Sequence, residues 1–142
     1  MDLFDRMLEL SGQGYYCAQI LMLLAMETEE KENPELIRAM SGLNGGLGFQ
    51  GKVCGALTGG CCVLGYFLGK GEAEEMEDPR AAQLTGALVQ WFEETIGKEY
   101  QGCNCREILE ENPANKMQRC PQIVEAVWEK CMEFLQESGL MD

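Results

Sequence analysis

The chain has 142 residues, eight cysteines, no histidine and a formal net charge of −13. This length suits one domain with its own core, so we expect residues 1–142 to form a single domain. The negative charge argues against nucleic acid and anionic membrane surfaces as partners, since both repel it. The lack of histidine excludes Cys–His catalytic pairs and mixed Cys/His zinc sites.

The spacing of the apolar residues is helical along the whole chain, with no alternating strand pattern. We therefore predict an all-α fold, a compact single-domain bundle of six to seven helices. A glycine-dense loop precedes the fourth helix, an acidic connector precedes the fifth, and Gly97 is expected to end the fifth. In chain order, the predicted helices cover roughly residues 3–10, 15–27, 34–41, 54–69, 79–97, 105–110 and 120–136.

Nothing in the sequence predicts export or membrane insertion. The first residues are acidic and lack the basic segment of a signal peptide. The longest apolar stretch, 53–69, is too short and too rich in glycine for a membrane span. We therefore expect a cytoplasmic protein, where abundant cysteine indicates redox work or metal binding before structural disulfides.

Four cysteines stand where a predicted helix begins: Cys17, Cys54, Cys105 and Cys120. A helix start offers free N–H groups and the positive end of the helix dipole, and both stabilise a thiolate. Each of the four is also the first member of its helix's apolar stripe. The thiols are therefore expected to point inward, where they could converge.

Basic residues lie close in sequence to three of these cysteines. Lys52 precedes Cys54 by two residues, and an arginine lies next to each of the others, as Arg106 and Arg119. We expect Cys54 to be the attacking thiol with a lowered pKa, because Lys52, the helix start and amides of the glycine-rich loop would act together. Cys105 or Cys120 would then resolve the mixed disulfide.

The order of these motifs resembles the family known by the cysteine pattern C_GCAxxG_C_C, whose members are described as redox-active. The resemblance covers roughly residues 15–127 and rests on Cys17-Ala18-Gln19, the loop glycines, Cys54-Gly55-Ala56-Leu57-Thr58-Gly59, Cys105 and Cys120. It implies a small redox-active or metal-related role for these four cysteines. It supplies no substrate.

Three functions remain open from the sequence. The first is a thiol–disulfide oxidoreductase that cycles between dithiol and disulfide, or holds a thiolate-bound redox centre, with a redox partner protein or a small thiol or disulfide as its partner. The second is a metal-binding module in which the same four cysteines hold an iron–sulfur cluster or zinc. The third is a structural helical interaction protein. The disulfide pairing and the oligomeric state stay undecided.

The other four cysteines lie outside the family pattern. Cys61 and Cys131 lie mid-helix on apolar stripes, and Cys62 is the neighbour of Cys61, so all three are expected to pack in the core. Cys103, two residues before Cys105, is a candidate resolving thiol for it.

Overall fold

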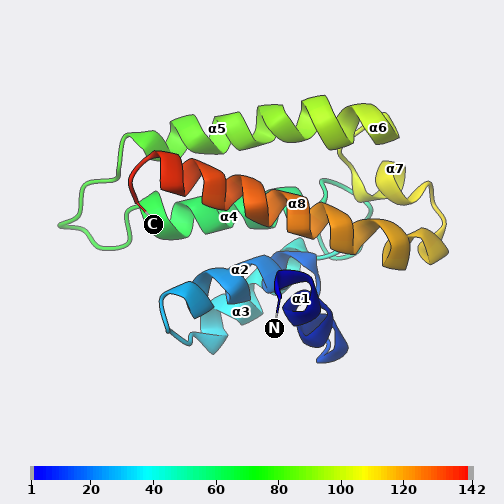
Figure 1. Ribbon diagram of the computed structural model, residues 1–142, viewed down its shortest axis with the longest axis horizontal. Helices are drawn as coiled ribbons and strands as arrows, with labels where there is room; N and C mark the ends of the chain where they lie inside the picture. The colour runs from blue at the N-terminus through cyan, green and yellow to red at the C-terminus, as the bar shows by residue number, and fades with distance from the viewer. Residues whose placement is uncertain (1, 141–142) are drawn as a thin grey trace.

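Helix α4 (Gly55–Leu68) runs through the middle of the fold in the computed structural model, which describes residues 2–140. It packs against α2 (Cys17–Thr28), α5 (Arg80–Phe92) and α8 (Lys116–Glu137). Figure 1 shows α5, α8 and α4 lying alongside one another, with α1, α2 and α3 on the other side of α4. The predicted all-α fold is confirmed.

The remaining elements are shorter. They are α1 (Leu3–Gly12), α3 (Pro34–Met40), the 3-10 turn η1 (Ser41–Leu43), the π-helical turn η2 (Glu93–Gly97), α6 (Lys98–Tyr100), α7 (Cys105–Leu109) and the 3-10 turn η3 (Pro113–Asn115). Within residues 2–140, the single β-bridge is an antiparallel one between Val53 and Asn104. None of the helices in this part of the chain has the length and apolar character needed to span a bilayer.

Small residues let α4 approach its neighbours closely. A Cβ atom at Gly59 would lie 2.8 Å from the Cα of Ala18, so the backbones of α4 and α2 meet at this point. A Cβ atom at Gly60 would lie 2.5 Å from a methyl carbon of Val127 on α8. Both glycines are buried, and their fit explains why a central helix tolerates residues of low helix propensity.

Two predicted helix boundaries are wrong. The helix that was expected to end at Gly97 continues through η2 and α6 to Tyr100, and the left-handed residue Gln101 ends it. Gly97 instead makes room for a neighbour, because a Cβ atom there would lie 3.0 Å from the sulfur of Cys103. Its small size therefore serves packing and does not mark a helix end.

The last helix begins at Lys116, four residues before the predicted start at Cys120. The side chain of Asn112 caps the turn η3, which leads directly into α8. Pro121 therefore lies inside the helix and does not open it. The Asn112-Pro113 pair is the real start signal, since asparagine caps and proline suits the first turn.

Candidate functional site

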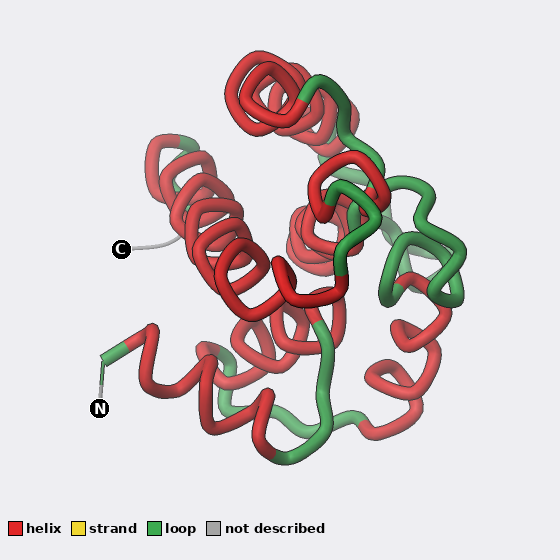
Figure 2. The backbone as a smooth tube through the Cα atoms, turned by 90° about the vertical axis from the view of Figure 1, so that its right-hand side faces the viewer, coloured by secondary structure: helices red, strands yellow, loops and turns green. Residues whose placement is uncertain are grey.

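A cavity of about 600 Å³ lies where α2, α4 and α7 begin and α8 makes its first turns. All four family-pattern cysteines line it: Cys17, Cys54, Cys105 and Cys120. Figure 1 shows the starts of α4, α7 and α8 at the same end of the bundle, and Figure 2 views the molecule from that end. The convergence expected from the apolar stripes is therefore seen at a single cavity.

Two backbone hydrogen bonds hold the starts of α4 and α7 together. The N–H of Cys54 donates to the carbonyl of Cys103 at 2.9 Å, and the N–H of Cys105 donates to the carbonyl of Lys52 at 2.7 Å. These bonds flank the Val53–Asn104 bridge. Cys54 is the N-cap of α4 and Cys105 the first residue of α7, so this short pairing brings two helix starts to one cavity.

Cys17 lies against the first residue of α4. A Cβ atom at Gly55 would come within 2.4 Å of the Cys17 sulfur, so this glycine leaves the space that the sulfur occupies. The backbone N–H of Gly45, in the glycine-rich loop, hydrogen-bonds to Cys17 and opposes the rise of its pKa. The loop amide was expected at Cys54, and this interaction is made with Cys17 instead.

Cys120 reaches the cavity from within α8. Because α8 begins at Lys116, Cys120 lies in its second turn and has no free N–H groups beside it. The prediction of a helix-start position is therefore wrong for this cysteine, while it holds for Cys17, Cys54 and Cys105. Its place in the cavity follows from the path of α8 across the bundle end.

Burial controls the acidity of these thiols. Desolvation, with a smaller contribution from the nearby Cys17 thiol, raises the pKa of Cys54 to about 12. The N–H groups of Ala56 and Leu57 act in the other direction but are outweighed. The expected lowering of the Cys54 pKa is thus wrong, since a side chain only 8% exposed loses more hydration than the helix start returns.

The other three thiols follow the same rule to different degrees. Burial raises the pKa of Cys120 to about 11, with Cys17 and Cys105 adding to the rise. It also raises the pKa of Cys17 and of Cys105. Cavity thiols also raise one another's pKa: Cys17 acts on Cys54, Cys105 and Cys120, and Cys105 acts on Cys120.

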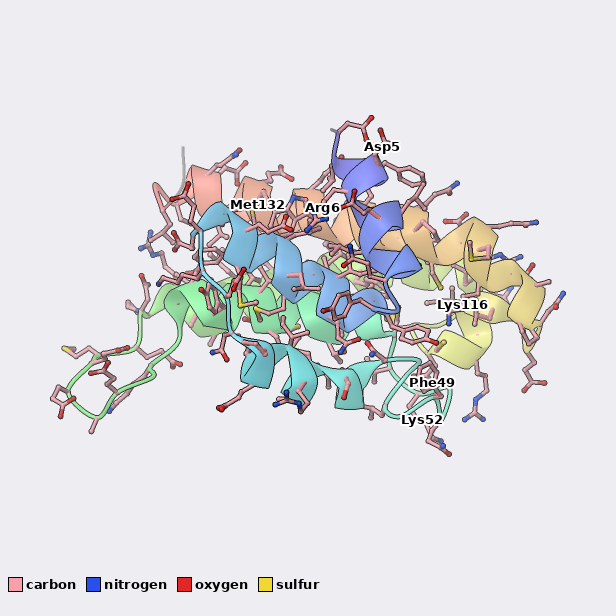
Figure 3. All side chains as sticks on the ribbon, turned by 90° about the horizontal axis from the view of Figure 1, so that it is seen from below. Asp5, Arg6, Phe49, Lys52, Lys116 and Met132 are labelled. Atoms are coloured by element: carbon pink, nitrogen blue, oxygen red, sulfur yellow. The ribbon has the colours of Figure 1, made fainter. Side chains whose placement is uncertain are left out.

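Of the three basic residues that lie next to the cysteines in sequence, two do not line the cavity. Lys52 is exposed and points away from the body of the molecule (Figure 3). Arg119 pairs with Glu110 at 2.9 Å, donates to the carbonyl of Ile108 and lies over the ring of Tyr100. Arg106 does line the cavity, with an exposed side chain.

Lys116 is the cation of the site that sequence reasoning missed. It lines the cavity, and its Nζ lies 4.2 Å from the centre of the Tyr16 ring and 5.7 Å from that of Phe49. Figure 3 shows it between the start of α8 and the loop that contains Phe49. Its charge opposes the rise in the pKa values of Cys17, Cys105 and Cys120.

The four cysteines outside the family pattern do not line this cavity, and all eight cysteines are free thiols. Cys131 is fully buried, which confirms its predicted place in the core, and its thiol contacts the carbonyl of Gly60 at 3.6 Å. Cys61 and Cys62 are half-buried and pack against the core. Cys103 faces Gly97, so its predicted role in resolving a disulfide of Cys105 gains no support.

The donor geometry bears on the metal-binding alternative. Across residues 2–140, no three Cys, Asp or Glu side chains are placed to hold one metal ion together. The four cavity cysteines lie around one space but do not form a ready ligand set for zinc or an iron–sulfur cluster. Metal binding at Cys17, Cys54, Cys105 and Cys120 therefore stays a prediction of the sequence.

Comparisons with known proteins give one match. The family model described as "Putative redox-active protein (C_GCAxxG_C_C)" covers residues 15–134, which include all four cavity cysteines. No curated protein matches the chain, and no solved structure does. The chain belongs to the C_GCAxxG_C_C family, as the order of its motifs indicates.

Proposed function

We propose that this protein performs thiol–disulfide exchange at the cavity lined by its four family cysteines. The observation that supports this function best is their arrangement: three helix starts and one helix interior bring four free thiols to one cavity. A chain that used cysteine only to fill its core would have no reason to line a cavity with them. The family's description as redox-active agrees with this function.

Cys105 is the proposed attacking thiol. It is the first residue of α7, it is only half-buried, and Lys116 favours its thiolate. Burial raises the pKa of Cys105 as well, but Cys54 is the poorer candidate because its pKa rises to about 12 and its side chain is only 8% exposed. The thiolate is the attacking form, so the more accessible thiol near a cation should react first.

Cys17 is the proposed resolving thiol. Its charge acts on Cys54, Cys105 and Cys120 alike, which indicates a central place among the four. Burial raises the pKa of Cys17, and a loop amide and Lys116 oppose that rise. Cys54 and Cys120 complete the wall of the cavity.

The exchange balances without a further reactant. The Cys105 thiolate attacks one sulfur of a small disulfide, the sulfur–sulfur bond breaks, and the leaving thiolate takes up a proton. The Cys17 thiolate then attacks the Cys105 sulfur of the mixed disulfide and releases the second thiol. Two protein thiols are oxidised to one disulfide while the substrate disulfide is reduced to two thiols.

The test treats anaerobically purified, metal-analysed protein with hydroxyethyl disulfide and maps its cysteines under non-reducing conditions. Wild type should form a Cys17–Cys105 disulfide. Cys17→Ser should stop at a mixed disulfide on Cys105, and Cys105→Ser should react far more slowly. Cys62→Ser, outside the cavity, is the matched control and should behave as wild type. Unchanged free thiols in wild type, or disulfides formed only among Cys61, Cys62 and Cys103, would refute the function.

A further inference from the structure

The cavity beyond its cysteines is mostly apolar. Its lining includes Met7, Leu8, Ile20, Leu109, Met117 and Val124, from four different helices. Its volume of about 600 Å³ lies within the range of small-molecule sites. The space around the thiols therefore suits an apolar body of modest size better than a charged peptide.

Lys116 at this cavity lacks the ion pair with a carboxylate that several other basic residues form. Arg6, Arg80, Arg119 and Lys130 each form an ion pair with a carboxylate. Among the described residues, no ion pair links Lys116 to a carboxylate, and its ammonium group lies over the rings of Tyr16 and Phe49. Although the chain has 24 acidic residues, this half-buried lysine forms no ion pair with any carboxylate that the structure describes, so its charge is available to an external anion.

The aromatic wall around Lys116 comes from separate segments. Tyr16 is the N-cap of α2, and its ring meets the Phe49 ring edge to face at 5.0 Å between centres. Phe49 adopts a left-handed φ of 63°, uncommon for a bulky residue, and its ring occupies the place of a Cβ atom at Gly45. The loop is thus shaped to hold a ring beside the ammonium group.

We propose that the cavity binds a small, mostly apolar molecule with a single carboxylate, whose anion pairs with Lys116 while its body lies along the apolar lining. This inference names the substrate class of the proposed exchange and rests on it: the substrate is an amphipathic disulfide or thiol with one acidic group. Lys116 is the half-buried cation of the cavity, whereas Arg106 at the same cavity is exposed, so the lining matches one carboxylate. The acidic surface repels ligands of higher negative charge.

The binding test uses fully reduced protein and two probes without sulfur, octanoate and octanol, measured by calorimetry. Octanoate should bind about tenfold tighter than octanol, because its charge-assisted pairing is formed in a half-dry site. Lys116→Met should remove this preference and Lys116→Arg should keep most of it. Lys130→Met is the matched control, since Lys130 also lies over aromatic rings of α5 and α8 but outside the cavity.

An exchange test separates recognition from thiol reactivity. A 1,2-dithiolane with a pentanoate tail is compared with its neutral amide, and the ratio of their rates cancels any effect of Lys116 on the thiolates. Wild type should prefer the acid by about tenfold, and Lys116→Met should show no preference. Equal binding of octanoate and octanol, no binding of either, or a preference that Lys116→Met retains overturns the inference.

The two proposals fail in different ways. If octanoate binds through Lys116 while hydroxyethyl disulfide forms no protein disulfide, thiol exchange is refuted and the binding site stands alone. If exchange proceeds but the acid and the amide react equally, the inference about the substrate class is refuted. Faster exchange with a protein disulfide or with glutathione disulfide than with the dithiolane acid would also overturn it.

Discussion

Gly59→Ala should destabilise the protein, although alanine is the better helix former. A Cβ atom at this position would lie 2.8 Å from the Cα of Ala18 and 3.2 Å from a methyl carbon of Leu21. The closer contact is with backbone, so the helices α2 and α4 must move apart. Gly59 ends the motif that begins at Cys54, and its neighbour across the contact, Ala18, directly follows Cys17 in α2.

The magnitude follows from two opposing effects. Replacing glycine by alanine inside a helix stabilises by about 1 kcal/mol. Overpacking a core costs about 1–3 kcal/mol, and contact with a backbone atom places Gly59→Ala at the upper end. The net loss in the free energy of unfolding should be about 2 kcal/mol. Gly65→Ala is the matched control on α4, because its Cβ atom would meet nothing within 4 Å, and it should gain about 1 kcal/mol.

Urea unfolding of the reduced proteins, followed by far-ultraviolet circular dichroism, measures both variants. Gly59→Ala should lower the midpoint and Gly65→Ala should raise it, with the urea dependence of the unfolding free energy unchanged. A Gly59→Ala midpoint at or above that of wild type would refute the reasoning. It would show that α2 and α4 can move apart to accommodate the methyl group without loss of unfolding free energy.

Three further outcomes are expected. Gly55→Ala should displace the Cys17 sulfur, because the new Cβ atom would lie 2.4 Å from it. The displacement should slow the formation of the Cys17–Cys105 disulfide, and peptide mapping at successive times measures that rate. The free energy of unfolding should fall as the pH rises from about 9 towards 12. In the unfolded chain the thiols lose their protons near the ordinary pKa of 9.0, whereas in the folded chain Cys54 and Cys131 keep theirs up to about 12. Urea midpoints across pH measure this loss, and an unchanged midpoint would contradict it. Cys131→Ala should reduce this loss of unfolding free energy at high pH, and it should itself lower the unfolding free energy at pH 7 by about 1–2 kcal/mol.

The fold followed well from the sequence because each long helix has a regular apolar stripe. Two predicted helix boundaries were wrong because the glycine or proline that was expected to mark them lies inside a helix. Gly97 fits against the Cys103 sulfur inside a continuing helix, and Pro121 lies within α8 because Asn112 had already started the preceding turn. A glycine or proline marks a helix end only when no neighbour requires its shape, and sequence alone does not show that neighbour.

The candidate site was predictable only in part, for a similar reason. The inward stripes placed the four cysteines together, since spacing along a helix determines which residues share a face. Tyr16, Phe49 and Lys116 could not be grouped, because they come from a helix cap, a loop and a helix start that was misplaced by four residues. The left-handed backbone of Phe49 has no sequence signal at all.

The predicted lowering of the Cys54 pKa was wrong for a reason that applies to any buried thiol at a helix start. A thiol that begins an inward-facing stripe gains helix N–H groups and loses water at the same position, so the two effects oppose each other. At Cys54 the loss of water prevails, and the pKa rises to about 12. Reactive thiolates at such a site therefore need a cation from elsewhere in the fold. Lys116 lies there, close enough to favour three of the four thiolates and without a carboxylate partner among residues 2–140. The charge that opposes the rise in these three pKa values is the same charge that we propose to hold an acidic substrate beside the thiols.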